Sequence, residues 1–263
     1  MQRIALAISV SILVFAFVSG CSQGPLRATE SSTSAPMIEL DHVYVAPSLS
    51  ASEDDVVQAL RESGFIVDDN RNVFPDGVVG RYIRFDNAYL ELLWLEPDAT
   101  PIEQLERAFE WETTGASPFG VGLRRVPEAP EELPFPSRSY VAEWMEPGTE
   151  MRILNDEDEL LAPALFVVPR YMEGFDAAEA AEWRAKDPKK AAKYLDHSLG
   201  VKMVTAVRIV TQPEGFPQAT EALNGTYVEI VRGDEALMEI EFDNGAQGER
   251  KDYRPLVPLV ISY

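Results

Sequence analysis

Apolar and polar residues alternate in the first regular stretch of the chain and then change to a helical spacing. Residues 38–46, IELDHVYVA, are rich in Val, Ile, Leu and Tyr and predict a strand. In residues 52–63, Ser52 precedes acidic residues, apolar residues follow at helical spacing, and Gly64 ends the run, which predicts a helix. The stretch FIVDD after Gly64 predicts another strand, and residues 80–97 predict two more, joined by a turn. The expected order is therefore β-α-β-β-β.

A similar pattern returns after a connecting helix. Residues 101–115 predict that helix, with Gly115 as its stop. A strand is expected at residues 119–126, but the four prolines in residues 127–136 argue against a helix behind it. Three further strands are predicted in residues 138–171. The second unit is therefore expected to carry a proline-rich loop in place of its helix.

The last part of the chain repeats the element order once more. Residues 177–195 predict helices broken near Pro188, and a strand at 201–211, a short helix or loop, and three strands follow. The pattern predicts an α+β fold of repeated β-α-β-β-β units. We expect one domain of two units at residues 38–175, and a helical linker with a third, degenerate unit at residues 176–263.

The N-terminus predicts export. A positive residue, Arg3, an apolar run and small residues before Cys21 follow the order of a secretory signal over residues 1–20. The apolar run is shorter than the roughly 20 residues that a membrane span needs. The residues VSGC resemble the lipobox of bacterial lipoproteins, which implies that Cys21 is lipidated. Residues 21–37, rich in Ser, Thr and Pro, predict a flexible tether. We expect a lipid-anchored protein of the bacterial cell envelope, and Ser22 favours the outer membrane, facing the periplasm or the surface.

Composition narrows the partners. The chain has 23 Lys and Arg against 44 Asp and Glu, a net charge of −21, which repels nucleic acid. Cys21 is the only cysteine, so disulfides within the chain and cysteine-based zinc sites are excluded. The expected partners are the membrane and a small organic ligand, with no nucleic acid; the oligomeric state stays open.

Two motifs in this order resemble the glyoxalase-like branch of the vicinal oxygen chelate superfamily. They are LDHVYVAP at residues 40–47 and RYIRFDNAYLELLWLEP at residues 81–97. The resemblance implies β-α-β-β-β units whose mixed sheets curl around a cleft. In the metal-dependent members each unit supplies one metal ligand from its first strand and one from its last. The matching residues in this chain are His42 and Glu91.

The second unit departs from that pattern. Comparison of the units places Gly122 where a second first-strand ligand would stand and Val168 where a second last-strand ligand would stand. His42 and Glu91 are fewer than the three protein ligands usual for catalytic zinc. The expected cofactor is therefore none, or one divalent metal ion at an incomplete site. His197 is either a further ligand or a residue that interacts with the dipole of the preceding predicted helix.

Other candidate residues follow from strand periodicity. With a period of two, Tyr89 shares a face with Glu91, so Tyr89 is a candidate binding residue. A buried carboxylate needs a partner, which a metal or His42 would supply. His42 is either a core histidine held by Glu91 or Asp41, or a metal ligand or catalytic residue, since a buried His–Glu pair without metal has the groups of a general base. Arg124 is a candidate for binding an anionic ligand in the cleft, and the alternative is an ion pair with a surplus carboxylate.

Three functions stay open at this point. The first is a lipid-anchored, glyoxalase-like protein that binds a small organic ligand without a complete metal site. The resemblance supports it, because the superfamily includes proteins that sequester antibiotics. The second is a divalent-metal-dependent lyase, isomerase or dioxygenase-type enzyme that uses His42 and Glu91. The third is an envelope interaction protein without small-molecule chemistry.

Overall fold

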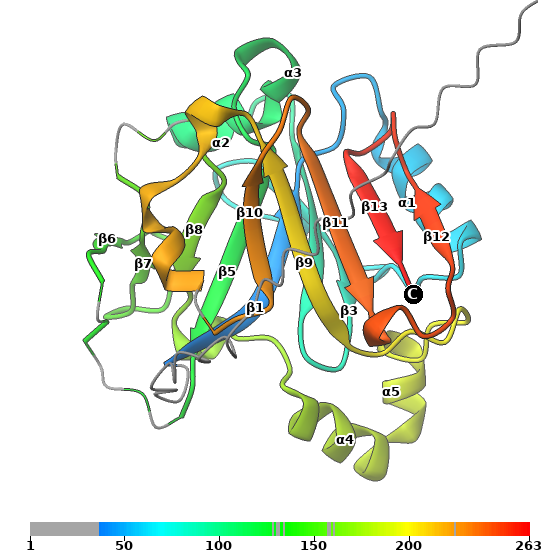
Figure 1. The fold of residues 1–263 in the computed structure, drawn as a ribbon. Helices are drawn as coiled ribbons and strands as arrows, with labels where there is room; N and C mark the ends of the chain where they lie inside the picture. The colour runs from blue at the N-terminus through cyan, green and yellow to red at the C-terminus, as the bar shows by residue number, and fades with distance from the viewer. Residues whose placement is uncertain are drawn as a thin grey trace, which may run out of the picture. The chain divides into compact units, whose positions relative to one another are not determined.

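The computed structural model describes residues 37–263, apart from residues 128, 130, 131, 134, 157, 158, 160 and 224. In this part of the chain, 13 strands form two mixed sheets, one with 8 strands and one with 5, and the helices lie around them (Figure 1). The predicted α+β class is confirmed. The predicted signal peptide, Cys21 and the predicted tether up to residue 36 lie outside the described residues. The carbonyl of Met37, the last residue of that tether, already accepts a hydrogen bond from Val126.

The first unit forms one half of the large sheet. Its elements are β1 (Ile38–Val45), α1 (Glu53–Glu62), β2 (Asn72–Val73), β3 (Val78–Arg84) and β4 (Tyr89–Leu95). The strand order is β2-β3-β4-β1, and the first strand pairs in parallel with the last. The Ser52 side chain caps α1 by accepting a hydrogen bond from the Asp55 N–H, as the sequence predicts.

The prediction of a strand directly after Gly64 is wrong. Residues 65–69 lie outside the sheet ladder, and the second strand is the two-residue β2 further along the chain. The backbone donors of this stretch are used elsewhere. The Ile66 N–H donates to the His197 ring, and the Asp68 N–H donates to the Tyr82 carbonyl. Phe65 and Val67 are buried, so apolar burial produced a strand-like pattern without strand pairing.

The second unit has the same strand order as the first. Helices α2 (Glu103–Phe109) and α3 (Trp111–Thr114) connect the units, and the second unit consists of β5 (Phe119–Arg125), β6 (Arg138–Tyr140), β7 (Met151–Ile153) and β8 (Ala164–Val167). Its order is β5-β8-β7-β6, again with the first strand parallel to the last. The described residues between β5 and β6 form no helix, as the prolines predict. Antiparallel pairing of β1 with β5 joins the units into one sheet.

The C-terminal part forms the smaller sheet. It comprises η1 (Arg170–Met172), α4 (Ala177–Lys186), α5 (Pro188–Tyr194), β9 (Val204–Thr211), η2 (Pro213–Gly215), η3 (Gln218–Leu223), β10 (Val228–Arg232), β11 (Leu237–Phe242), η4 (Asp243–Gly245), β12 (Arg250–Asp252) and β13 (Leu259–Ser262). The sheet order is β10-β9-β11-β13-β12. Its first strand pairs in parallel with the second strand rather than the last, and β12 is an additional strand. The pairing therefore differs from that of the first two units.

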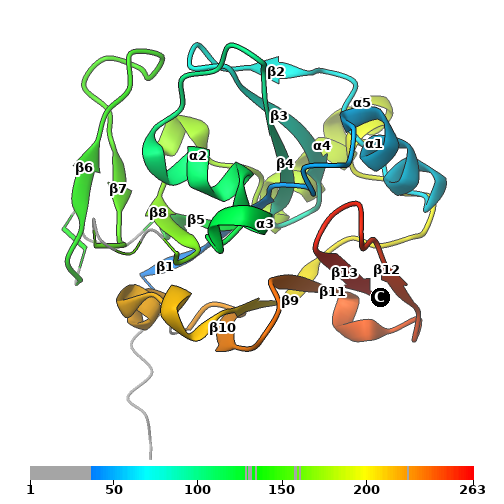
Figure 2. The same ribbon diagram turned by 90° about the horizontal axis from the view of Figure 1, so that it is seen from above.

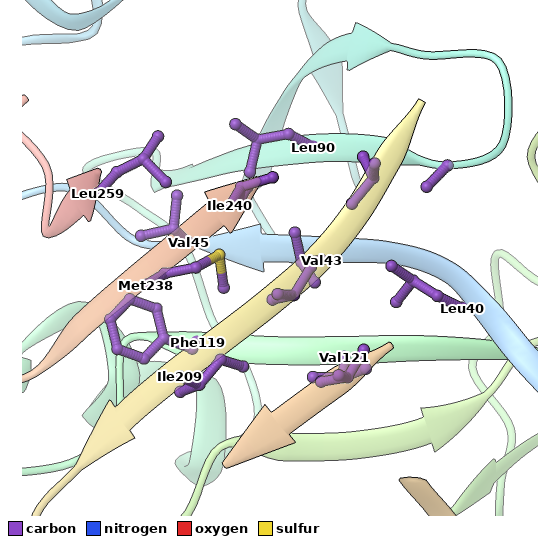
Figure 3. Packing of buried hydrophobic residues seen from close by; sticks show 14 of the residues in the cluster. Leu40, Val43, Val45, Leu90, Phe119, Val121, Ile209, Met238, Ile240 and Leu259 are labelled. Atoms are coloured by element: carbon purple, nitrogen blue, oxygen red, sulfur yellow. The ribbon is translucent and has the colours of Figure 1, made fainter. Parts of the chain in front are cut away.

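Strand periodicity decides what each face of the large sheet contacts. Val43 and Val45 of β1 pack with Ile209 and Ile240 of the C-terminal sheet in one apolar core (Figure 3). Seen from above, the C-terminal sheet lies along one side of β1 (Figure 2). We call this side of the large sheet its core face. His42 alternates with these valines and points to the opposite side, which we call the cleft face.

Candidate functional site

A cavity of about 190 Å³ lies on the cleft face of the large sheet. Strands of both units line it, and the side chains of Ile102 and Leu105, at the start of α2, border it. Its wall is mostly apolar, and seven of the lining residues are aromatic: Tyr44, Phe74, Tyr82, Tyr89, Tyr140, Trp144 and Phe166. His42 and Glu91 are among the few polar residues of the wall. The large sheet therefore curves around a cleft, and the predicted pair lies inside it.

An irregularity in β1 positions the histidine. Leu40 pairs with Leu123 and His42 pairs with Gly122, so Asp41 is an extra residue without a partner on β5, which is the geometry of a β-bulge. The bulge lets two consecutive side chains reach each other. The His42 Nδ1–H donates to the Asp41 carboxylate over 2.7 Å. The other ring nitrogen, Nε2, lies 4.0 Å from a Glu91 oxygen.

Neighbouring rings and a glycine fix the His42 imidazole. It stacks on Tyr89 with a centroid separation of 4.4 Å and an interplanar angle of 14°, and Phe166 meets it edge-on at 5.4 Å. On the remaining side the ring lies across Gly122. A Cβ atom at Gly122 would stand 2.2 Å from the His42 Cε1. The imidazole therefore has one fixed orientation, with Nε2 turned towards Glu91.

Glu91 is a buried acidic residue in the cavity wall. It comes from β4, is 8% exposed, and sits where the alternation of that strand points into the cleft. Burial raises the pKa of the Glu91 carboxyl, and the nearby His42 and Tyr82 side chains oppose that rise. Burial and the Glu91 charge likewise raise the pKa of the Tyr82 hydroxyl. The carboxyl is therefore held in a setting that favours its neutral form.

Arg124, which the sequence analysis predicts as a binding residue in the cleft, lies outside the cavity wall. It lies behind Asp41, 3.6 Å from that carboxylate. Its Nε donates to Glu39 over 2.8 Å and its Nη1 donates to the Phe175 carbonyl over 2.9 Å. The Gly174 N–H in turn donates to Asp41 over 2.7 Å. Arg124 thus positions Asp41 and the chain segment beside it, because its donors are already used.

The donor set does not fit a complete metal centre. In the first unit, His42 pairs with Tyr89, and Glu91 follows two residues later. In the second unit, Gly122 pairs with Phe166, and Val168 follows two residues later, so Glu91 and Val168 occupy equivalent positions. The second unit therefore contributes no ligand, and the His42 ring fills the space above Gly122. Within residues 37–263, as far as they are described, no group of three or more metal-ligating side chains is found. Among the described residues of the cavity wall, His42 Nε2 and the Glu91 carboxylate lie 4.0 Å apart as possible ligands, and Asp76 is a further carboxylate in the lining.

His197 is a core histidine remote from the cavity wall. Its Nδ1 accepts a hydrogen bond from the Ile66 N–H, and its Nε2–H donates to the Arg84 carbonyl, each over 2.9 Å. Phe65 and Phe85 pack against its ring. Burial lowers the pKa of this imidazole. Both ring nitrogens of His197 are therefore used in backbone hydrogen bonds, and neither is left for the predicted roles of metal ligand or helix-dipole partner.

Several residues of the site escaped the sequence analysis. These are Tyr44 and Tyr82 in the wall, Phe166 against His42, and Gly174, which lies against Tyr89 and donates to Asp41. One signal was available. The sequence of β5 places glycines at every second position, and a Cβ at Gly120 would stand 2.1 Å from the Tyr44 ring. Alternating glycines in a strand mark a face on which side chains of a neighbouring strand lie flat.

Comparison with known proteins assigns no family to the chain. No family model matches it, and no curated protein is similar to it. A solved structure described as a hypothetical protein from Staphylococcus aureus matches with a TM-score of 0.40 and 13% identity, over 86% of this chain and 99% of that one. That likeness is too distant to carry an argument, so the site rests on this chain's own geometry. Within the described part of the chain, no helix has both the length and the apolar character to cross a membrane.

Proposed function

We propose that residues 38–175 form a glyoxalase-like domain that binds a small organic ligand in the cleft, without a complete metal site. The observation that carries this proposal is the cavity itself, with an aromatic wall and the His42–Glu91 pair inside it. Ligand sites combine mostly apolar walls with a few placed polar groups, and this cavity has that composition.

The pairing of the strands supports the glyoxalase-like assignment. Two units of four strands each place the first strand parallel to the last, and their first strands meet at the centre of one sheet. This arrangement is the one that the sequence resemblance implies.

The size of the cavity limits the ligand. Its volume of about 190 Å³ is below the range of about 300–1,000 Å³ that drug-sized ligands occupy. An apolar cavity of about 150 Å³ accommodates benzene. The ligand class that fits is a molecule built on a single ring.

A fragment screen tests this function. Single-ring compounds are screened by ligand-observed NMR against the full-length chain and against Ala164→Trp, which fills the cavity from β8. The matched control is Ala178→Trp on the exposed surface of α4. Compounds that bind the wild type and Ala178→Trp but not Ala164→Trp are expected. If every binder is indifferent to Ala164→Trp, the cleft is not the ligand site.

The cellular setting is a separate proposal. The lipobox-like residues before Cys21 support lipid anchoring in the bacterial envelope. Expression in a Gram-negative host with radiolabelled palmitate is expected to label the wild-type chain and place it in the membrane fraction. Cys21→Ser is expected to remove the label. Equal labelling of both chains would exclude this cysteine as the anchor.

The hydrogen bond between Asp41 and His42 favours a second candidate function, metal-free acid–base catalysis. An oriented imidazole with a free nitrogen facing a ligand cavity has the geometry of a general base. Screened binders would be incubated with the protein in D₂O and examined by mass spectrometry. Deuterium exchange into a bound compound that is lost in His42→Gln supports catalysis. If no compound gains deuterium, the cavity binds ligands without acid–base catalysis.

A further inference from the structure

The two buried acids of the site differ in their partners. Asp41 is fully buried and compensated, because the His42 Nδ1–H, the Gly174 N–H and the Arg124 guanidinium surround it. Glu91 has no comparable set. Among the described residues its nearest basic nitrogen is His42 Nε2 at 4.0 Å, the Tyr82 hydroxyl is a second polar neighbour, and the Arg84 charge acts on it from further away. A buried carboxylate with so few donors is costly for the empty protein.

The surroundings of Glu91 indicate what would complete it. The carboxyl faces a cavity whose wall includes Tyr44, Tyr89 and Phe166. Aromatic faces attract a cation that comes within about 6 Å of the ring centroid, and an ammonium also donates charge-assisted hydrogen bonds to a carboxylate. The net charge of the chain, −21, further favours cations near the protein.

We propose that the cavity takes a small organic cation, a protonated or quaternary amine on a single ring, with its charge at Glu91 and its ring against the aromatic wall. This inference rests on the proposed function, because it assigns a ligand class to the same cavity. Arg138 also lines the cavity, but from the edge strand β6, with four strands between it and β4. Its Nε is buried without a hydrogen-bond partner among the described residues, but the residue as a whole is partly exposed, whereas Glu91 is only 8% exposed.

A set of probes of similar shape and different charge tests the inference. Benzylamine, benzyltrimethylammonium, benzyl alcohol and benzoate are titrated into the full-length wild-type chain by calorimetry. We expect both cations to bind at least about tenfold more tightly than benzyl alcohol, because each brings a positive charge to the Glu91 carboxylate and the aromatic faces, and benzylamine also donates charge-assisted hydrogen bonds. Benzoate is expected to bind most weakly. This comparison needs no variant and so does not depend on how any variant folds.

Two variants assign the effect to Glu91. Glu91→Gln keeps the shape of the side chain and is expected to reduce the affinity for benzylamine to that for benzyl alcohol. Glu229→Gln makes the same change in net charge at a side chain of β10 that is 70% exposed, and is expected to leave the preference unchanged. An equal loss in both variants would attribute the preference to the overall charge and overturn the inference.

The remaining outcomes separate this inference from the proposed function. If benzyl alcohol or benzoate binds as tightly as the amines, the cavity is a ligand site and only the cationic class is wrong. If none of the four probes binds, the inference and the proposed function both fail. If the wild type binds one Zn²⁺ ion and Glu91→Gln does not, a metal ion completes the carboxylate and the organic cation is excluded.

Discussion

The first and second units share one strand order but carry opposite chemistry at equivalent places. Where the first unit has His42 and Glu91, the second has Gly122 and Val168. Tyr89 of the first unit corresponds to Phe166 of the second, and both rings contact the imidazole. The first unit therefore supplies the His42–Glu91 pair of the cleft, and the second supplies space and a mostly apolar wall that also includes Arg138.

The second unit lacks a first-strand ligand for a steric reason. Gly122 is not a vacant position, because the His42 ring occupies the volume that its side chain would need. A symmetric pair of ligands on β1 and β5 is therefore sterically excluded while His42 keeps this orientation. The asymmetry is also supported by two further residues of the sheet, because the Asp41 carboxylate holds the histidine ring and the Arg124 guanidinium lies 3.6 Å from that carboxylate.

Arg124→Ala gives the largest expected effect, because Arg124 is where the second unit supports the chemistry of the first. The Arg124 and Asp41 side chains are 6% and 0% exposed, so removing the guanidinium leaves a buried charge with one partner fewer. A loss of about 3–5 kcal/mol in the free energy of unfolding is expected from urea titration. Arg208→Ala, at a surface pair whose arginine is 48% exposed, should cost less than about 1 kcal/mol. Similar losses in the two variants would contradict a stabilising buried ion pair between Arg124 and Asp41.

Gly122→Ala tests the steric part of the comparison. The added methyl group would meet an imidazole that Asp41, Tyr89 and Phe166 prevent from moving, so about 1–3 kcal/mol of stability is expected to be lost. A double-mutant cycle with His42→Ala sharpens the test. Once the ring is absent, adding Gly122→Ala should cost less than about 0.5 kcal/mol. An unchanged cost in the His42→Ala background would show that the glycine serves another neighbour.

His197 provides the contrast to His42, because it packs in the core and binds two backbone groups away from the cavity. Burial places its folded-state pKa below 6.5, so the unfolded chain binds a proton more readily. Its contribution to stability is complete above about pH 6.5 and is lost as the pH falls below that value, by at most about 1.4 kcal/mol per pH unit. His197→Gln is expected to flatten this part of the curve of unfolding free energy against pH. An identical slope in wild type and variant would assign the effect to other groups.

The local pattern predicted the first unit well because its strands obey one simple rule. The alternation in β4 placed Tyr89 and Glu91 on one face and Leu90 and Leu92 on the other, and the cavity and the core divide in that way. The same rule failed for Arg124. Periodicity gives the face of the sheet, but not which neighbour already occupies the donors of a side chain there.

Features that depend on distant segments could not be predicted. Two backbone N–H groups of residues 65–69, those of Ile66 and Asp68, donate to His197 and to the Tyr82 carbonyl instead of forming a regular strand ladder. The packing of the C-terminal sheet on the core face depends on matching apolar surfaces, such as those of Val43 and Ile209, that no local motif reports. The bulge at Asp41 is likewise visible only in the pairing with β5.

Glu91→Gln has the smallest expected effect on stability, and its sign is opposite to that of the other variants. Burial raises the folded-state pKa of the Glu91 carboxyl above its unfolded value of about 4.5, so the folded chain binds that proton more tightly. Stability is therefore lost as the pH rises from about 4.5 through the folded pKa. The neutral amide avoids this loss and should stabilise the protein at neutral pH by on the order of 1 kcal/mol, with the difference vanishing near pH 4. The corresponding position of the second unit, Val168, carries no such cost because it is apolar. Urea titrations of the two chains at several pH values measure the difference, and a destabilised Glu91→Gln at neutral pH would mean that the carboxylate is already compensated in the empty protein.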